Sequence, residues 1–186
     1  FGGKGVSYCA TCDGAFFRNK TVAVIGGGPA GMEAAGVLRS RGFAVTLFEK
    51  EEKLAGSMNL ADKSYHKEKI TYAARTMAEE LRRLGVAVVS GHEPTVDEVK
   101  ALHPAGVVVA CGAKPIIPNV PGVDLSHVVT SHEVIAGRVI VTGKAVVIGS
   151  GMTGLECTEG LCMSGCEVSM VEMLPQVIAD IKRAMK

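Results

Sequence analysis

The sequence is poor in aromatic residues and carries almost no net charge. Of its 186 residues, 4% are aromatic and none is tryptophan, so an apolar core must be built mainly from Val, Ile, Leu and Ala. The net charge is +1, with Lys and Arg spread among Asp and Glu, so the sequence indicates no face for nucleic acid or for an anionic membrane surface. No apolar run approaches the roughly 18 residues that span a bilayer, and no export signal opens the chain.

The histidines show no ligand spacing, and no metal site is predicted. Most of the six cysteines lie inside apparent strands and helices, which favours reduced thiols and a cytoplasmic protein. The last three match no ferredoxin pattern and are expected to be buried structural thiols: Cys157, Cys162 and Cys166. The methionines around them are expected in the core: Met152, Met163, Met170 and Met173. The histidines are expected on the surface or in loops: His66, His92, His103, His127 and His132.

Strands and helices are predicted to alternate along most of the chain. Apolar runs indicate strands at 21–25, 44–48, 86–89, 106–110, 145–148 and 167–171. Helical patterns occupy 29–41, 64–84, 96–102 and 153–164, and prolines make an extended connector at 115–121. Such alternation is typical of α/β proteins with parallel sheets and right-handed crossovers.

An internal repeat is the strongest signal in the sequence. A three-glycine pattern occurs twice, 123 positions apart (149 − 26): Gly26, Gly28 and Gly31, then Gly149, Gly151 and Gly154. The same offset pairs residues of the flanking strands and helices, and it pairs Glu49 with Glu172. We therefore expect a duplicated fold, in which two Rossmann-like βαβ modules form two related nucleotide sites.

Each glycine set stands in the context that a dinucleotide site requires. It follows an apolar strand, opens a helix, and precedes by 23 positions a glutamate after the second strand (49 − 26 and 172 − 149). The glycines permit a tight turn, close approach of a pyrophosphate, and packing of helix on strand, while the helix N-terminus attracts phosphate. The glutamate would accept hydrogen bonds from ribose hydroxyls. The alternative is a pair of turns that bind no nucleotide.

These motifs resemble those of the flavoprotein pyridine-nucleotide oxidoreductases. Residues 22–59 are similar to the FAD-binding start of that family, above all to the C-terminal half of bacterial NADH:flavin oxidoreductases of the 2,4-dienoyl-CoA reductase type. Residues 106–121 resemble the second FAD motif, with Cys111 where threonine is usual, and 145–174 resemble the inserted NAD domain. The resemblance implies FAD-binding residues: Gly26, Gly28, Pro29, Ala30, Gly31, Glu49, Lys50, Ala110 and Gly112. It implies NAD-binding residues: Gly149, Gly151, Met152, Thr153, Gly154 and Glu172.

Other parts that the resemblance leads one to expect are missing from the sequence. No Gly-Asp dipeptide is present for the flavin's ribityl-phosphate side, and no FMN barrel or iron–sulfur motif is visible. We therefore expect an incomplete protein. It would comprise a lead segment at 1–20, an incomplete FAD-binding-type domain at 21–142 and a truncated NAD-binding domain at 143–186.

The lead segment resembles a different relative. The stretch CATCD, with Cys9, Cys12 and Asp13, is similar to the redox-active disulfide of low-molecular-weight thioredoxin reductases. That resemblance implies that Cys9 attacks a partner disulfide, Cys12 exchanges electrons with the flavin and Asp13 handles the proton. A zinc half-site and inert thiols are the alternatives. The module that follows is of the FAD type rather than the NADPH type, so a natural rearrangement and a join of two genes both stay open.

The predicted function is transfer of electrons from NADH through FAD to a disulfide or to another redox centre. Glu172 would bind the ribose 2′-hydroxyl and repel a 2′-phosphate, and no cation follows it closely, so NADPH is disfavoured. Expected partners are the nicotinamide nucleotide and either a thioredoxin-like disulfide protein or a separate FMN or iron–sulfur domain. The alternatives are a thioredoxin-disulfide reductase that uses Cys9 and Cys12, and a non-catalytic nucleotide-binding fragment.

Overall fold

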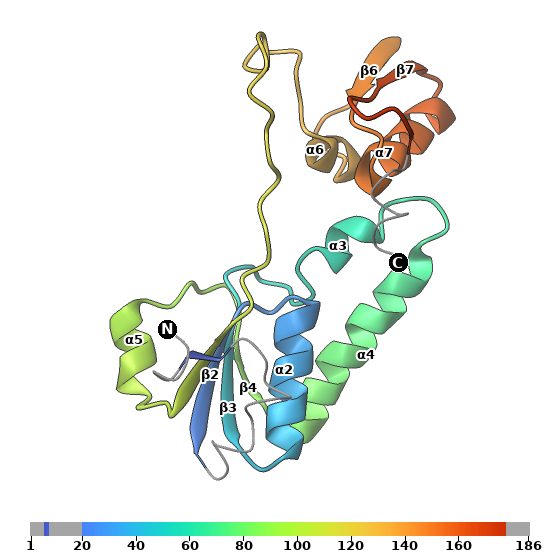
Figure 1. Ribbon diagram of the computed structural model, residues 1–186. Coiled ribbons are helices and arrows are strands. Elements are labelled where there is room, and N and C mark those ends of the chain that lie inside the picture. The colour runs from blue at the N-terminus through green and yellow to red at the C-terminus, as the bar shows by residue number, and fades with distance from the viewer. Residues whose placement is uncertain (1–5, 8–19, 178–186) are drawn as a thin grey trace. The chain divides into compact units, whose positions relative to one another are not determined.

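The computed structural model describes residues 6–7 and 20–177, which form two compact units (Figure 1). Unit 1 comprises Phe1–Asn59 and Lys69–Lys114, and unit 2 comprises Leu60–Glu68 and Pro115–Lys186. Among the described residues, no helix is long and apolar enough to cross a membrane. Cys9, Cys12 and Asp13 lie outside the described residues.

Unit 1 is built on a sheet of five parallel strands. In chain order these are β1 (Val6–Ser7), β2 (Thr21–Ile25), β3 (Ala44–Phe48), β4 (Ala87–Val89) and β5 (Gly106–Val109). Their order across the sheet is β1-β5-β2-β3-β4, and in register Val24 pairs with Leu47 of β3 and with Val108 of β5. Helices α2 (Pro29–Ser40) and α4 (Glu68–Leu84) cover one face, and α5 (Val96–Ala101) lies on the other (Figure 1).

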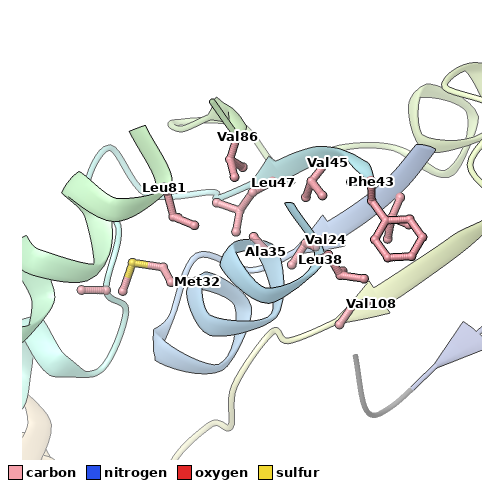
Figure 2. Packing of buried hydrophobic residues seen from close by; sticks show 12 residues of the cluster. Val24, Met32, Ala35, Leu38, Phe43, Val45, Leu47, Leu81, Val86 and Val108 are labelled. Atoms are coloured by element: carbon pink, nitrogen blue, oxygen red, sulfur yellow. The ribbon is translucent and has the colours of Figure 1, made fainter. Parts of the chain in front are cut away.

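The core of unit 1 lies between the sheet and helices α2 and α4 (Figure 2). Met32, Ala35 and Leu38 recur every three residues along α2, so they share one face of the helix and are buried against the strands. Val24 and Leu47 are 0% exposed beneath them. Burial of a Met, Leu or Val side chain contributes about 1.5–3 kcal/mol, and this packing holds the ends of the strands in place.

Unit 2 contains a smaller module of the same design. Strands β6 (Lys144–Ile148) and β7 (Glu167–Val171) pair in parallel, α7 (Met152–Met163) connects them, and α6 (Ser131–Ile135) packs beside α7. Its core is a cluster around Cys157, Leu161 and Cys166. The expectation of an α/β protein with parallel βαβ modules is thus confirmed.

The helix expected at 64–84 begins at Glu68 instead. His66 lies in the left-handed region at φ 58°, which stops the helix from extending backwards. The side chains of Ser64 and Lys67 are also engaged with Glu156 on α7, so tertiary bonds hold this segment in a turn.

Two helices were not expected from the sequence, α3 (Met58–Ala61) and α6. A signal for α6 was present: Thr130 and Glu133 form a reciprocal capping box, in which each side chain accepts from the other's backbone N–H. Since α6 has only five residues, hydrophobic periodicity could not reveal it.

The expected burial of unit 2 was wrong at several positions. Cys162 is exposed, whereas Cys157 and Cys166 are buried as expected. Met152, Met163 and Met173 are also exposed rather than in the core. His132, expected at the surface or in a loop, is half-buried in α6. A two-stranded sheet with two helices buries too little surface among the described residues to cover all of its apolar side chains.

Candidate functional site

The first glycine turn joins β2 to α2 at the carboxyl end of the sheet. Gly26 has φ 105°, and a Cβ built on it would lie 2.3 Å from the carbonyl oxygen of Ala110. A Cβ on Gly31 would lie 1.8 Å from the carbonyl oxygen of Gly26. Contacts this short exclude any side chain at either position, so both glycines are required by the close approach of helix, turn and strand.

Glu49 ties the end of β3 to this turn. Its carboxylate accepts the N–H of Gly27 at 2.7 Å through Oε2 and the N–H of Glu51 at 2.9 Å through Oε1. The residue is only 6% exposed. A buried carboxylate needs donors, and two of its roughly four lone-pair sites are filled by described residues. The other two accept no hydrogen bond from a described residue.

A loop after β3 closes over the other side of the turn. The N–H of Ala55 donates to the carbonyl of Gly27 at 2.7 Å, and Ala55 is buried with φ 85°, in the left-handed region that favours glycine. A Cβ on Gly56 would lie 3.1 Å from Cα of Gly28. Both polar groups of Gly27 are thus used within the protein, which fixes the turn before any ligand binds.

The second glycine turn, between β6 and α7, repeats this geometry. Gly149 has φ 99°, and a Cβ on Gly154 would lie 2.0 Å from the carbonyl oxygen of Gly149. The N–H of Gly149 donates to the carbonyl of Val171 at 2.8 Å, as that of Gly26 does to Phe48 at 2.8 Å. The repeat seen in the sequence is therefore a repeat of backbone conformation.

Glu172 plays the part of Glu49 in the second module. Its Oε2 accepts the N–H of Ser150 at 2.8 Å and the Ser150 hydroxyl at 2.7 Å, and its Oε1 accepts the N–H of Leu174 at 2.8 Å. These bonds, first that of Leu174 and then the hydroxyl and amide of Ser150, lower the pKa of Glu172 to about 2, with a smaller contribution from the Met173 N–H. The carboxylate is therefore fully ionised at neutral pH.

Both turns leave the start of a helix open. Gly28 and Gly151 are the N-cap residues, neither helix has a side-chain cap or an acidic residue in its first turn, and Pro29 follows Gly28. No described atom lies within 4 Å of a Cβ built at Gly28 or Gly151. Free N–H groups and open space at a helix N-terminus fit the phosphates of a dinucleotide.

The structure brings most of the expected site residues together in two groups. In unit 1, Ala110 lies against the glycine turn and donates its N–H to the carbonyl of Ile25 at 2.7 Å. Lys50 is exposed, and a Cβ built on Gly112 would meet no described atom within 4 Å apart from its chain neighbours. In unit 2, Met152 and Thr153 lie in the open first turn of α7. Gly27, Ala55 and Ser150 were missed, because their roles depend on contacts with distant residues. No group of three metal-ligating side chains occurs among the described residues.

Comparison with known proteins gives the family. The family model described as pyridine nucleotide-disulphide oxidoreductase matches residues 20–186, which is nearly the whole chain. The chain belongs to this family. The fold and the kinship expected from the sequence are thereby confirmed, and the chain is a flavoprotein oxidoreductase module of a family that uses FAD and a nicotinamide nucleotide.

Individual members of the family are similar over most of the chain. A bilirubin reductase of Mediterraneibacter gnavus is 37% identical over 91% of this chain and 26% of its own length. An NADH oxidase of Thermoanaerobacter brockii is 37% identical over 88% of this chain and 26% of its own length. A solved 2-naphthoyl-CoA reductase superimposes with a TM-score of 0.81 and 31% identity, over 88% of this chain and 25% of its own. The chain thus spans about a quarter of the length of these three relatives.

Proposed function

We propose that this chain binds FAD at the first glycine turn and NADH at the second, and passes electrons from the nicotinamide nucleotide to the flavin. The proposal rests on one observation. The two turns have the same geometry, and in each module the glutamate after the second strand accepts a hydrogen bond from the turn. Nicotinamide and flavin supply the redox chemistry when bound, while the residues of the chain bind and orient them.

In the first site, the open start of α2 would hold the pyrophosphate of FAD and Glu49 would hold its ribose. The proposed FAD-binding set is Gly26, Gly28, Pro29, Ala30, Gly31, Glu49, Lys50, Ala110 and Gly112. Replacement of Glu49 by Ala is expected to weaken FAD binding by roughly 1–3 kcal/mol, the scale of hydrogen bonds to a charged group. Unchanged binding in isothermal titration would remove Glu49 from this set.

In the second site, NADH is the preferred nucleotide in this proposal. The set is Gly149, Gly151, Met152, Thr153, Gly154 and Glu172. Glu172 is ionised and lies where the ribose of the adenosine half would bind, so a 2′-phosphate would meet its negative charge. The residues that follow it, Met173, Leu174 and Pro175, offer no cation. Tighter binding of NADPH than of NADH would contradict this assignment.

The final electron acceptor belongs to the proposal as well. It is a disulfide if Cys9 and Cys12, with Asp13, form a redox-active pair, and otherwise a redox centre on another domain. The division into a lead segment, an FAD-type domain at 21–142 and an NAD-type domain from 143 is part of the same interpretation, as is a cytoplasmic location.

Anaerobic reduction of added FAD tests the central proposal. The purified chain is mixed with FAD and then with NADH, and flavin absorbance near 450 nm (roughly) is followed. Loss of this absorbance is expected at a rate above that of free FAD with NADH, and Gly154→Ala should abolish the increase. A chain that binds both nucleotides without accelerating reduction would be the non-catalytic fragment instead.

A further inference from the structure

The two modules differ at the residue between the first two glycines. Gly27 fills this position in unit 1 and Ser150 in unit 2, where it is 1% exposed. Both residues donate their backbone N–H to Oε2 of the glutamate, at 2.7 Å for Gly27 and 2.8 Å for Ser150. Only Ser150 adds a second bond, since its hydroxyl donates to the same oxygen at 2.7 Å.

The surroundings explain why serine stands in one module and glycine in the other. A Cβ on Gly27 would lie 2.5 Å from Cδ2 of Leu54 and 2.9 Å from Cβ of Glu49, so a side chain here would require Leu54 and Glu49 to shift. In unit 2 the Ser150 side chain has room and points at Glu172. The difference is therefore built into the packing around each turn.

The extra bond changes what each carboxylate can offer to a ligand. An ionised carboxylate has about four lone-pair sites, two on each oxygen. Described donors occupy one site on each oxygen of Glu49, which leaves one site on each oxygen. On Glu172 they occupy both sites of Oε2 and one of Oε1, so at most one site is left, on Oε1.

We propose that Ser150 is a positioning residue that commits one oxygen of Glu172 to the protein, so that the second site holds a single ribose hydroxyl where the first site holds two. This inference rests on the proposed binding of NADH at the second site. A ribose held by one hydrogen bond rather than two leaves faster, because each bond to a charged group contributes to affinity. Weaker binding suits the second site, where the nucleotide must exchange in every turnover, whereas the first site retains its FAD.

Removal of the hydroxyl should therefore tighten binding rather than weaken it. In Ser150→Ala, Oε2 of Glu172 regains a free site that a second ribose hydroxyl can occupy. The dissociation constant of NADH, measured by nucleotide fluorescence with the full chain, is expected to fall by about three- to tenfold, the scale of one net hydrogen bond. Ser164→Ala is the matched control, since it removes an exposed hydroxyl that donates to Gly160 in the same unit, and it should leave NADH binding unchanged.

A second measurement needs no nucleotide. The amide signals of Ser150 and Leu174 in proton–nitrogen NMR report the ionisation of Glu172, because both groups donate to its carboxylate. In the unsubstituted chain these signals should stay constant down to about pH 3. In Ser150→Ala the pKa of Glu172 should rise, and the Leu174 signal should begin to shift at higher pH than in Ser164→Ala.

The outcomes separate failure of this inference from failure of the proposed function. If the unsubstituted chain binds NADH and Ser150→Ala binds it equally or more weakly, Ser150 has a merely structural role and the inference is wrong. An unshifted Leu174 titration in Ser150→Ala would also overturn it. If NADH does not bind to the unsubstituted chain at all, both the proposed function and the inference are wrong, whatever the pH titration of the Leu174 signal shows.

Discussion

The two glycine turns have the same backbone geometry but stand in different surroundings. Both begin with a glycine near φ 100°, and in both a glutamate after the second strand of the module accepts a hydrogen bond from the turn. Strand β2, which leads to the first turn, is buried at Val22, Ala23 and Val24, whereas Val146 and Ile148 of β6 are 65% and 66% exposed. The same local motif therefore forms in a complete core and in a sparse one.

This difference arises from neighbours that are distant in sequence. In unit 1, β2 lies between β3 and β5, and Ala110 at the end of β5 contacts the glycine turn. Among the described residues of unit 2, β6 pairs only with β7, and no atom lies within 4 Å of a Cβ built at Gly149. The turn conformation is thus the same in both units, whereas in unit 1 the end of a third strand also packs against the turn.

The third glycine of each turn gives the largest expected effect. Gly31→Ala and Gly154→Ala would place a Cβ 1.8 Å and 2.0 Å from a carbonyl oxygen. Each should destabilise its own module by about 3 kcal/mol or more, at or beyond the upper end of overpacking costs, and abolish nucleotide binding there. Thermal unfolding and titration of FAD and NADH would measure both effects. Gly36→Ala, where a Cβ meets Leu81 Cδ2 at an ordinary 3.6 Å, is the control and should not destabilise α2.

The first glycine should distinguish the two modules. In both Gly26→Ala and Gly149→Ala the alanine would have a positive φ, which costs about 1–3 kcal/mol of backbone strain. In Gly26→Ala the new Cβ would in addition lie 2.3 Å from the carbonyl oxygen of Ala110. Unit 1 should therefore lose more stability than unit 2, as followed by hydrogen exchange in each unit. Equal losses would mean that β5 does not constrain the first turn.

Acid should affect the second module through Glu172. Its pKa is lowered from 4.5 to about 2 in the folded chain, so its bonds stabilise the fold fully above pH 4.5, and this stabilisation is lost as the pH falls toward 2. Glu172→Gln should be less stable than the unsubstituted chain at pH 7, with the gap narrowing below pH 4.5. A gap that is constant from pH 7 to pH 3, measured by urea unfolding, would argue against an ionised Glu172 bonded to Ser150.

The smallest effect on activity is expected from a substitution near the N-terminus. Cys9→Ser should leave reduction of thioredoxin by NADH and FAD unchanged, because the cysteine pair leads into the FAD-type strand at Thr21 rather than into the second module. Cys9 and Cys12 should still form a disulfide with each other, which thiol titration would detect. Turnover that requires Cys9 would show that the pair is coupled to the flavin.

The sequence by itself determined the features that depend on near neighbours. The bounds of β2, β3 and β7 agree with the predicted strands, because a continuous apolar run or an alternation of side chains is a local property. The two glycine turns and their glutamates were predictable for the same reason, since a positive φ needs glycine and the repeat shows the pattern twice.

Only the tertiary structure decided which partners these residues meet. Ser64 and Lys67 bind Glu156, so α4 starts later than its pattern suggests. Met173 is 93% exposed although its apolar side chain suits a core, because burial depends on how many elements surround a strand. The bond from the Ser150 hydroxyl to Glu172 joins residues 22 positions apart. Such contacts depend on packing between distant segments, which sequence patterns do not encode.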